Sequence, residues 1–279
     1  MPAELVPAPR PRRPRRRPHR RVLAHLAEQG VPFLVGGGYA LRHYTGDVRG
    51  TRDLDLFVRR RDARRLLDTL AALGLETDLI FPHWLGKARL GSESIDVIYS
   101  SGNGIAVVDD DWFRNAVSAT VLGVRVDLSP PEEMIWSKAF VMERERFDGA
   151  DIAHLLLACQ KRLDWHRLVR RFGPHWRVLL AHLVLFGFIY PSERGAAPAG
   201  VMRLLGRRLA REGREPAPEE RVCRGTLLSR AQYLTDVFRR GYADARLGPD
   251  SGMTPEDVAR WTAAIESEEK SRNAAGRGR

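Results

Sequence analysis

The sequence predicts an α/β (α+β) fold, in which a small mixed sheet with flanking helices is followed by a helical domain. Between residues 22 and 130, segments with apolar residues at helical spacing alternate with short apolar runs that are typical of strands. From residue 131 onward the pattern is helical almost throughout, with glycine and proline at the breaks. The 279 residues, 43% of them hydrophobic, suffice for one large or two modest packed domains.

The N-terminal segment is strongly basic. Residues 1–21 hold eight arginines and one glutamate, so they carry much of the formal net charge of +11. Their prolines oppose a regular helix, and we expect a disordered basic arm over residues 1–21. Such an arm either binds nucleic acid through counterion release or stays solvated, and both readings remain open. We place the catalytic α/β domain at residues 22–130, the helical domain at residues 131–265 and a flexible tail at residues 266–279.

The first element of the α/β part is a strand followed by a glycine turn. Residues 31–35 are mostly apolar, Gly36, Gly37 and Gly38 come next, and a helical pattern begins near Tyr39. Glycine lets the backbone approach a ligand closely, and a helix start presents free N–H groups to a phosphate. On its own, a glycine triplet is more often only a tight turn. Whether this turn binds a phosphate therefore has to be judged together with the next strand of the chain.

That strand is short and carries two carboxylates. Asp53 and Asp55 are two residues apart in an apolar run, so both side chains project from one face of the strand. Two like charges so close are costly unless a cation lies between them. Mg²⁺ suits this position, because it binds oxygen ligands and often combines one or two carboxylates with the phosphates of a substrate. The order of strand, glycine turn, helix and Asp-x-Asp strand favours phosphoryl or nucleotidyl transfer.

The remaining α/β elements continue the alternation. Residues 60–75 have the spacing of an amphipathic helix, and residues 87–91, 94–100 and 120–129 have that of strands. Asp96 lies in the second of these strands between apolar neighbours. Asp109, Asp110 and Asp111 precede a short helix, where we expect them to cap it rather than bind a metal.

The second half of the chain offers fewer chemical signals. Residues 178–190 are strongly apolar but too short to cross a hydrocarbon layer of about 30 Å, so we expect a buried central helix and no membrane partner. His182 within them is expected to be a core histidine. Residues 203–214 and 224–246 are expected to form arginine-rich helices. Cys159 and Cys223 are far apart and are expected to be thiols in a reducing cytoplasm, and no secretory signal comes after the arm.

The segment GGYALRHYTGDVRGTRDLDLFV resembles the first motif of the DNA polymerase beta-type nucleotidyltransferases. The likeness is greatest to the compact bacterial branch that includes abortive-infection-type toxins. It covers roughly residues 31–157, although the loop between Gly38 and Asp53 is slightly longer than usual. The resemblance implies a nucleotidyltransferase-type domain and a Mg²⁺-dependent enzyme that uses a nucleoside triphosphate.

The resemblance also implies roles for particular residues. The expected catalytic residues and metal ligands are Asp53, Asp55 and Asp96. Nucleotide binding would involve Gly37, Gly38, Arg49, Thr51 and Lys138. Lys138 would contact phosphates, while Asp148 and Asp151 would organise a helix junction.

Three hypotheses describe the function. The first is transfer of a nucleoside monophosphate from a nucleoside triphosphate to an acceptor hydroxyl, for example an RNA 3′ end. The second is the same chemistry on a small hydroxylated molecule such as an aminoglycoside. The third is a non-catalytic module that binds nucleotide or nucleic acid. The basic arm favours the first, the small charge of the remainder favours the second, and the three carboxylates oppose the third. The sequence does not decide the oligomeric state.

Overall fold

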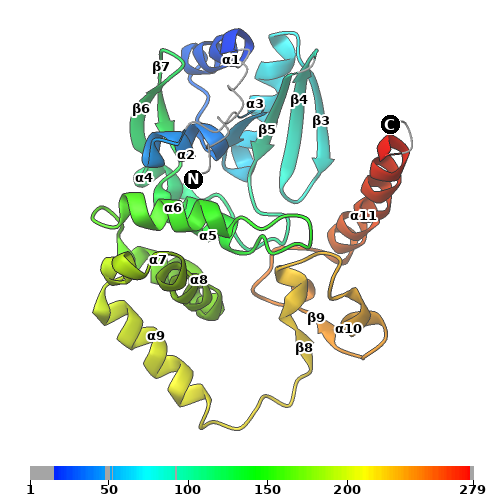
Figure 1. Cartoon of the computed structure of the whole chain (residues 1–279). Coiled ribbons are helices and arrows are strands. Elements are labelled where there is room, and N and C mark those ends of the chain that lie inside the picture. The colour runs from blue at the N-terminus through cyan, green and yellow to red at the C-terminus, as the bar shows by residue number, and fades with distance from the viewer. Residues whose placement is uncertain (1–15, 48–50, 52, 92, 277–279) are drawn as a thin grey trace, which may run out of the picture.

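A mixed seven-stranded sheet forms the first half of the protein (Figure 1). The computed structural model describes residues 16–276 except 48–50, 52 and 92. The strand order is β3-β4-β5-β2-β1-β7-β6, with parallel pairing of β1 with β7 and of β2 with β5 and antiparallel pairing elsewhere. The strands are β1 (Leu34–Val35), β2 (Asp53–Phe57), β3 (Glu76–Phe81), β4 (Leu85–Leu90), β5 (Glu93–Ile98), β6 (Val117–Val121) and β7 (Val124–Leu128). The predicted fold class is confirmed.

Side chains of the central strands alternate between two faces of the sheet. Leu54 and Leu56 of β2 are buried on the face that helices α1 (Arg16–Glu28) and α3 (Arg60–Ala72) cover. Gly86 of β4 faces α3, because a Cβ atom added to it would lie 2.9 Å from Leu67. The residues between these positions must point to the opposite face. That face carries the predicted carboxylates.

Helix α1 corrects the predicted N-terminal arm. It begins at Arg16, so residues 16–21 are helical rather than part of a disordered segment. Pro18 is its third residue, in the first turn, where a missing N–H group costs nothing because that group has no partner within the helix. The rest of the arm, residues 1–15, lies outside the described residues.

Helices dominate the second half. They are α5 (Pro131–Ala139), α6 (Gly149–Cys159), α7 (Trp165–Phe172), α8 (Trp176–Ile189), α9 (Ala199–Glu212), α10 (Leu234–Phe238) and α11 (Pro255–Gly276). Helix α11 crosses the boundary predicted at residue 265 and packs beside β3 of the sheet (Figure 1). The helix predicted at residues 224–246 is wrong: this stretch contains short 3-10 turns, α10 and β9 (Ala243–Asp244), which pairs with β8 (Val222–Cys223).

The apolar segment Trp165–Ile189 is long enough to cross a membrane by length and composition alone. The structure divides it into α7 and α8 at a 3-10 turn, where Gly173 has φ +46°. Arg167 of α7 is buried and pairs with Glu132 and Glu133 of α5, and α8 packs against α5, α6 and α7. These contacts bury one face of α8, whereas Val184 and Phe188 are exposed, so the predicted buried central helix is confirmed only in part.

Several smaller predictions are confirmed. The side chain of Asp109 caps α4 (Asp110–Arg114) by accepting hydrogen bonds from the backbone N–H groups of Asp111 and Trp112. The Nε2 atom of His182 lies 3.0 Å from the carbonyl oxygen of Ala139, so this histidine is a satisfied core residue. The two cysteines are free thiols.

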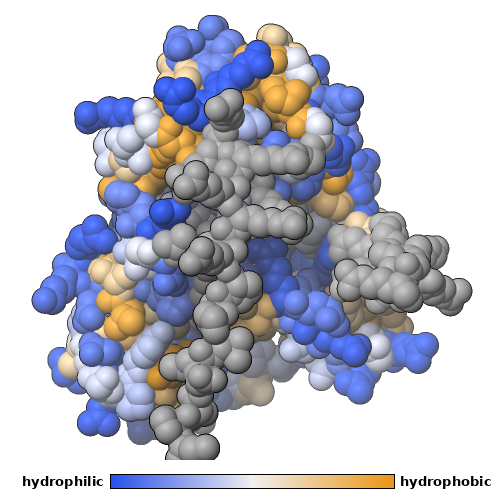
Figure 2. Space-filling view, turned by 45° about the horizontal axis from the view of Figure 1, so that its top comes forward, coloured by the Kyte–Doolittle hydropathy of each residue, from blue (hydrophilic) through white to orange (hydrophobic). Residues whose placement is uncertain are grey.

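The α/β and helical parts are joined by charge as well as by apolar packing. Arg171 of α7 donates to both carboxylate oxygens of Asp109, at 2.6 and 2.9 Å, and to Glu133 of α5 at 3.0 Å. The buried apolar residues of both parts form one continuous core. On the face drawn in Figure 2, hydrophilic side chains predominate and apolar groups form separate patches.

Candidate active site

Three aspartates line one cavity at the open face of the sheet. Asp55 of β2 and Asp96 of β5 are directly opposite each other in the parallel β2–β5 pair, and Asp53 is opposite Ser94. Neighbouring strands lie about 4.8 Å apart, so the two facing carboxylates are close neighbours. Asp53, Asp55 and Asp96 all contribute to the lining of the cavity. The structure thus brings together the three carboxylates that the sequence singled out.

The glycine turn lies against the carboxylate of Asp55. Helix α2 (Gly37–Thr45) begins at Gly37, which has φ +51°. A Cβ atom added to Gly37 would lie 1.6 Å from Oδ2 of Asp55, and one added to Gly38 would lie 2.7 Å from Cβ of Thr51. Only glycine permits both approaches. Gly37 and Gly38 line the cavity, so the start of α2 faces the space beside the aspartates.

The electrostatics at Asp55 favour a bound cation. Burial, followed by the charges of Asp96 and Asp53, raises the pKa of the Asp55 carboxyl to about 6, although Lys138 and Arg146 act in the opposite direction. A divalent cation would relieve this repulsion, so the residues fit Mg²⁺. Within the described ranges, no group of three or more His, Cys, Asp or Glu side chains is already arranged as a metal site.

Two of the other predicted nucleotide-binding residues, Thr51 and Lys138, line the cavity. Thr51 lines the cavity, and its hydroxyl donates to the carbonyl oxygen of Asp53 at 2.9 Å. Arg49 lies outside the described residues. Lys138 of α5 also lines the cavity, but its Nζ atom lies 2.8 Å from Asp148 and 2.9 Å from Asp151. Its contact with phosphates stays a prediction.

Lys138 is held in its charged form by its neighbours. Burial alone would lower the pKa of its ammonium group, but Asp148 and Asp151 raise the pKa above its usual value. Arg146 donates to both oxygens of Asp148 at 3.0 Å. Asp148 and Asp151 therefore join the start of α6 to α5, and Lys138 and Arg146 bring positive charge toward Asp55.

Lys87 is a site residue that the sequence reasoning missed. It lies opposite Asp96 in the antiparallel β4–β5 pair, and its Nζ atom donates to Oδ1 of Asp96 at 2.9 Å. Lysine is rare in this arginine-rich chain, and residues 87–91 have the pattern of a strand. The rarity of lysine and the strand pattern could therefore have drawn attention to Lys87, but its pairing with Asp96 depends on the strand register.

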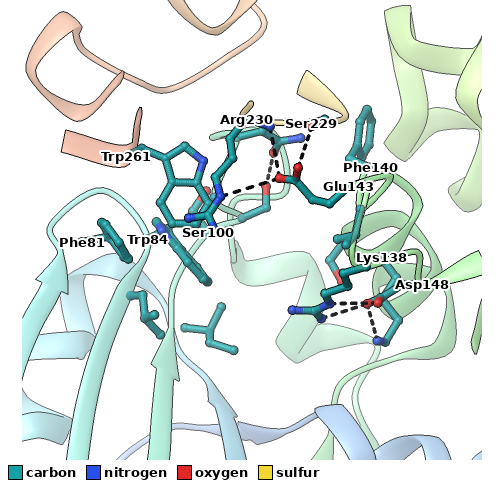
Figure 3. A pocket seen from close by; sticks show the side chains of 18 of the residues that line it. Phe81, Trp84, Ser100, Lys138, Phe140, Glu143, Asp148, Ser229, Arg230 and Trp261 are labelled. Atoms are coloured by element: carbon teal, nitrogen blue, oxygen red, sulfur yellow. Dashed lines mark hydrogen bonds and ion pairs between the residues drawn. The ribbon is translucent and has the colours of Figure 1, made fainter. Parts of the chain in front are cut away.

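The cavity has two chemically different ends. Its volume is about 1190 Å³, and residues of the sheet, of α5 and of the segment 226–265 line it. The aspartate end holds Asp53, Asp55 and Asp96. The aromatic end holds Phe81, Trp84 and Trp261. Figure 3 shows the three aromatic side chains and Arg230 on one side, with Lys138 and Asp148 on the other.

Comparison with known proteins finds a family profile that matches part of the chain. Residues 19–119 match the sequence profile of the family described as aminoglycoside-2''-adenylyltransferase. A search of functionally curated proteins found no significant match.

Solved structures of adenylyltransferases and related proteins are similar at low identity. The antibiotic-resistance factor ANT(2'')-Ia is 20% identical, with 60% of this chain and 95% of that one covered and a TM-score of 0.41. The lincosamide antibiotic adenylyltransferase LnuA is 13% identical, with coverage of 50% and 94% and a TM-score of 0.37. A nucleotidyltransferase-like protein from Paracoccidioides brasiliensis is 17% identical, with coverage of 65% and 90% and a TM-score of 0.43.

The profile match spans the glycine turn and all three aspartates. It agrees with the resemblance found in the motif and with the geometry of β2, β5 and α2. The non-catalytic hypothesis is therefore set aside. Over residues 19–119 the chain is similar to the aminoglycoside-2''-adenylyltransferase family, in agreement with the nucleotidyltransferase-type domain expected from the sequence.

Proposed function

We propose that the protein transfers a nucleoside monophosphate from a nucleoside triphosphate to a hydroxyl group of a small molecule, with Mg²⁺ as the cofactor. The observation that carries this proposal is the contact of Gly37 with Asp55, directly opposite Asp96. It combines phosphate-binding backbone with paired carboxylates in one space. An enzyme of nucleotidyl transfer needs both, because charge develops on phosphate oxygens in the transition state.

Each residue has a role in this chemistry. The backbone N–H groups of Gly37 and Gly38 would bind triphosphate oxygens at the start of α2. Asp53 and Asp55, with Asp96 beside them, would hold Mg²⁺, which neutralises phosphate charge when bound. The ammonium group of Lys138, near Asp55, would add positive charge as pyrophosphate leaves.

Asp96 is the candidate general base. Lys87 holds its Oδ1 atom, which leaves Oδ2 to accept the proton of the acceptor hydroxyl. The acceptor oxygen then forms a bond to the α-phosphorus, while the bond from that phosphorus to pyrophosphate breaks. The proton ends on Asp96 and the electron pair leaves with pyrophosphate.

Two classes of acceptor can be compared with the family match. The family profile favours an aminoglycoside, since its description names aminoglycoside-2''-adenylyl transfer. An RNA 3′ end, predicted from the basic arm, gains no support from the family match.

Labelled nucleotides test the proposal directly. The protein is incubated with each α-³²P nucleoside triphosphate, Mg²⁺ and one of three acceptor pools: total RNA, tobramycin or neutral glycosides. We expect label in a small-molecule product, and loss of that product in Asp53→Asn and Asp55→Asn. Asp68→Asn is the matched control, because Asp68 is exposed on α3 and pairs with Arg64. Labelled RNA would refute the small-molecule acceptor, and no transfer to any pool would refute the function.

A further inference from the structure

The aromatic end of the cavity is completed by a distant part of the chain. Trp261 of α11 meets Phe81 at 4.6 Å between ring centroids and Trp84 at 5.3 Å, nearly perpendicular to both. The Cζ atom of Arg230 lies 4.6 Å from the centroid of the Trp261 ring. Phe81 and Trp84 are nearly parallel to each other and Trp261 is perpendicular to both, so the three rings form an apolar corner with one cation on the Trp261 ring. Trp261 and Arg230 lie outside residues 19–119, which match the family.

The negative charge of Glu143 at the aromatic end is already compensated by contacts within the protein. Glu143 accepts a hydrogen bond from the hydroxyl of Ser229 at 2.6 Å and from the backbone N–H group of Arg230 at 3.1 Å. The Nε atom of Arg230 is 3.8 Å from the same carboxylate. Glu143 is therefore occupied in holding the segment around residue 230 (Figure 3). A ligand with several ammonium groups would have to compete with these contacts for the carboxylate.

Two buried polar atoms at the aromatic end form no hydrogen bond within the described structure. Among the described residues, neither Oγ of Ser100 nor Nε1 of Trp84 has a hydrogen-bond partner, although both atoms are buried. Ser100 is only 6% exposed and lines the cavity, as does Trp84. A buried polar group without a partner is costly, so a ligand that reaches these atoms after a small shift of the two side chains and supplies a partner would bind favourably. Hydroxyl groups can both donate and accept such bonds.

The cavity has room for a second ligand beside the nucleotide. Its volume of about 1190 Å³ exceeds the range of roughly 300–1,000 Å³ that is usual for a single ligand. Asp96, Ile98 and Ser100 are alternate residues that line it in sequence. With a rise of about 3.3 Å per residue, Ile98 lies roughly 7 Å from Asp96 along β5, and Ser100 lies beyond the end of that strand. A molecule seated on the aromatic end would thus reach toward the aspartates.

We infer that the aromatic end binds the acceptor, and that the acceptor is a neutral hydroxylated molecule with a flat apolar face, such as an aryl glycoside, rather than a polycation. The inference rests on the proposed function for the reaction itself. The flat face packs into the corner between Trp261 and Trp84, against the face of one ring and the edge of the other, and the hydroxyl groups satisfy Ser100 and the Trp84 indole. One further hydroxyl points toward Asp96, where the nucleotide is transferred.

Calorimetric titration of the full chain with two probes tests the inference. The probes are 4-nitrophenyl β-D-glucopyranoside, which is neutral, and tobramycin, which is polycationic. We expect saturable binding of the glucoside at one site, at least tenfold weaker in Trp261→Ala and within threefold of the original in Trp261→Phe. Trp165→Ala is the control for loss of an indole, because Trp165 is half-buried on α7 and does not line the cavity. Thermal unfolding of each variant shows whether it is folded.

A separate titration with Mg²⁺ and a non-hydrolysable nucleoside triphosphate analogue distinguishes this inference from the proposed function. If the analogue binds but the glucoside does not, the inference is overturned and the function stands. If tobramycin binds more tightly than the glucoside, or if Trp261→Ala leaves glucoside binding unchanged, the inference is also overturned. If the glucoside binds through Trp261 and the analogue does not bind, the aromatic site stands and the function fails.

Discussion

Replacing Gly37 by alanine should displace the carboxylate of Asp55 while leaving the fold intact. The added Cβ atom would lie 1.6 Å from Oδ2, 2.5 Å from Cγ and 3.0 Å from Cβ of Asp55. An ordinary contact needs about 3.4 Å, so Oδ2 must move by well over 1 Å. Because the close contacts extend to Cγ and Cβ, the whole Asp55 side chain must shift, and β2 must give by a few tenths of an ångström at this residue.

The size of the effect can be worked out from this displacement. A misplacement of about 1 Å in a catalytic group can cost roughly 100-fold in rate, which corresponds to about 2.7 kcal/mol in the activation free energy. The left-handed backbone of Gly37, with φ +51°, adds about 1 kcal/mol of destabilisation in the folded state. We therefore expect a folded variant with at least a 100-fold lower kcat/KM.

Gly46→Ala is the matched control. Gly46 ends the same helix with φ +77°, but a Cβ atom added there meets nothing within 4 Å. Both variants should lose similar stability in urea denaturation, and only Gly37→Ala should lose pyrophosphate release with the acceptor found by the labelling screen. Equal activity of the two variants, or a Gly37→Ala rate within threefold of the original, would refute the role assigned to this contact.

The remaining predictions concern charge. In the metal-free protein the Asp55 pKa is raised from 3.8 to about 6, so the folded state binds this proton more tightly than the unfolded state and gains stability as the pH falls from about 6 to 4. Asp55→Asn should remove that part of the pH dependence in thermal melts, and identical pH profiles for both proteins would contradict it. Lys138→Met leaves Asp148 and Asp151 without their ammonium partner, so the free energy of unfolding should fall by about 3 kcal/mol in urea denaturation. A fall below about 1 kcal/mol would show that the pair contributes little.

The aspartate end could be predicted because its geometry is local. Apolar neighbours around Asp53, Asp55 and Asp96 predict strands, and the alternation of a strand fixes which residues share a face. The glycine turn is equally local, since Gly37 and Gly38 need only their own backbone and the start of α2. The contact between Gly37 and Asp55 could not be predicted, because it depends on the pairing of β1 with β2.

The other parts of the site depend on register and on long-range packing. Lys87 reaches Asp96 because β4 and β5 pair in one particular register, which no spacing rule supplies. Trp261 contacts residues of the sheet that are far away in the sequence. Nothing in its sequence surroundings distinguishes it from an ordinary core tryptophan. The helix expected over residues 224–246 fails for a similar reason. Tertiary contacts such as the Glu143 hydrogen bonds to Ser229 and Arg230 fix short turns there instead.

If the aromatic end binds the acceptor as we infer, helix α11 makes the two halves of the chain depend on each other for selectivity. Strands β2 and β5 carry the carboxylates, whereas Arg230 and Trp261 at the other end of the cavity lie far along the chain. Substitutions around Arg230 and Trp261 can therefore alter which molecule is modified without touching the groups that break the phosphoanhydride. New specificities would then arise from changes near the C-terminal end, while the strands β2 and β5 stay as they are.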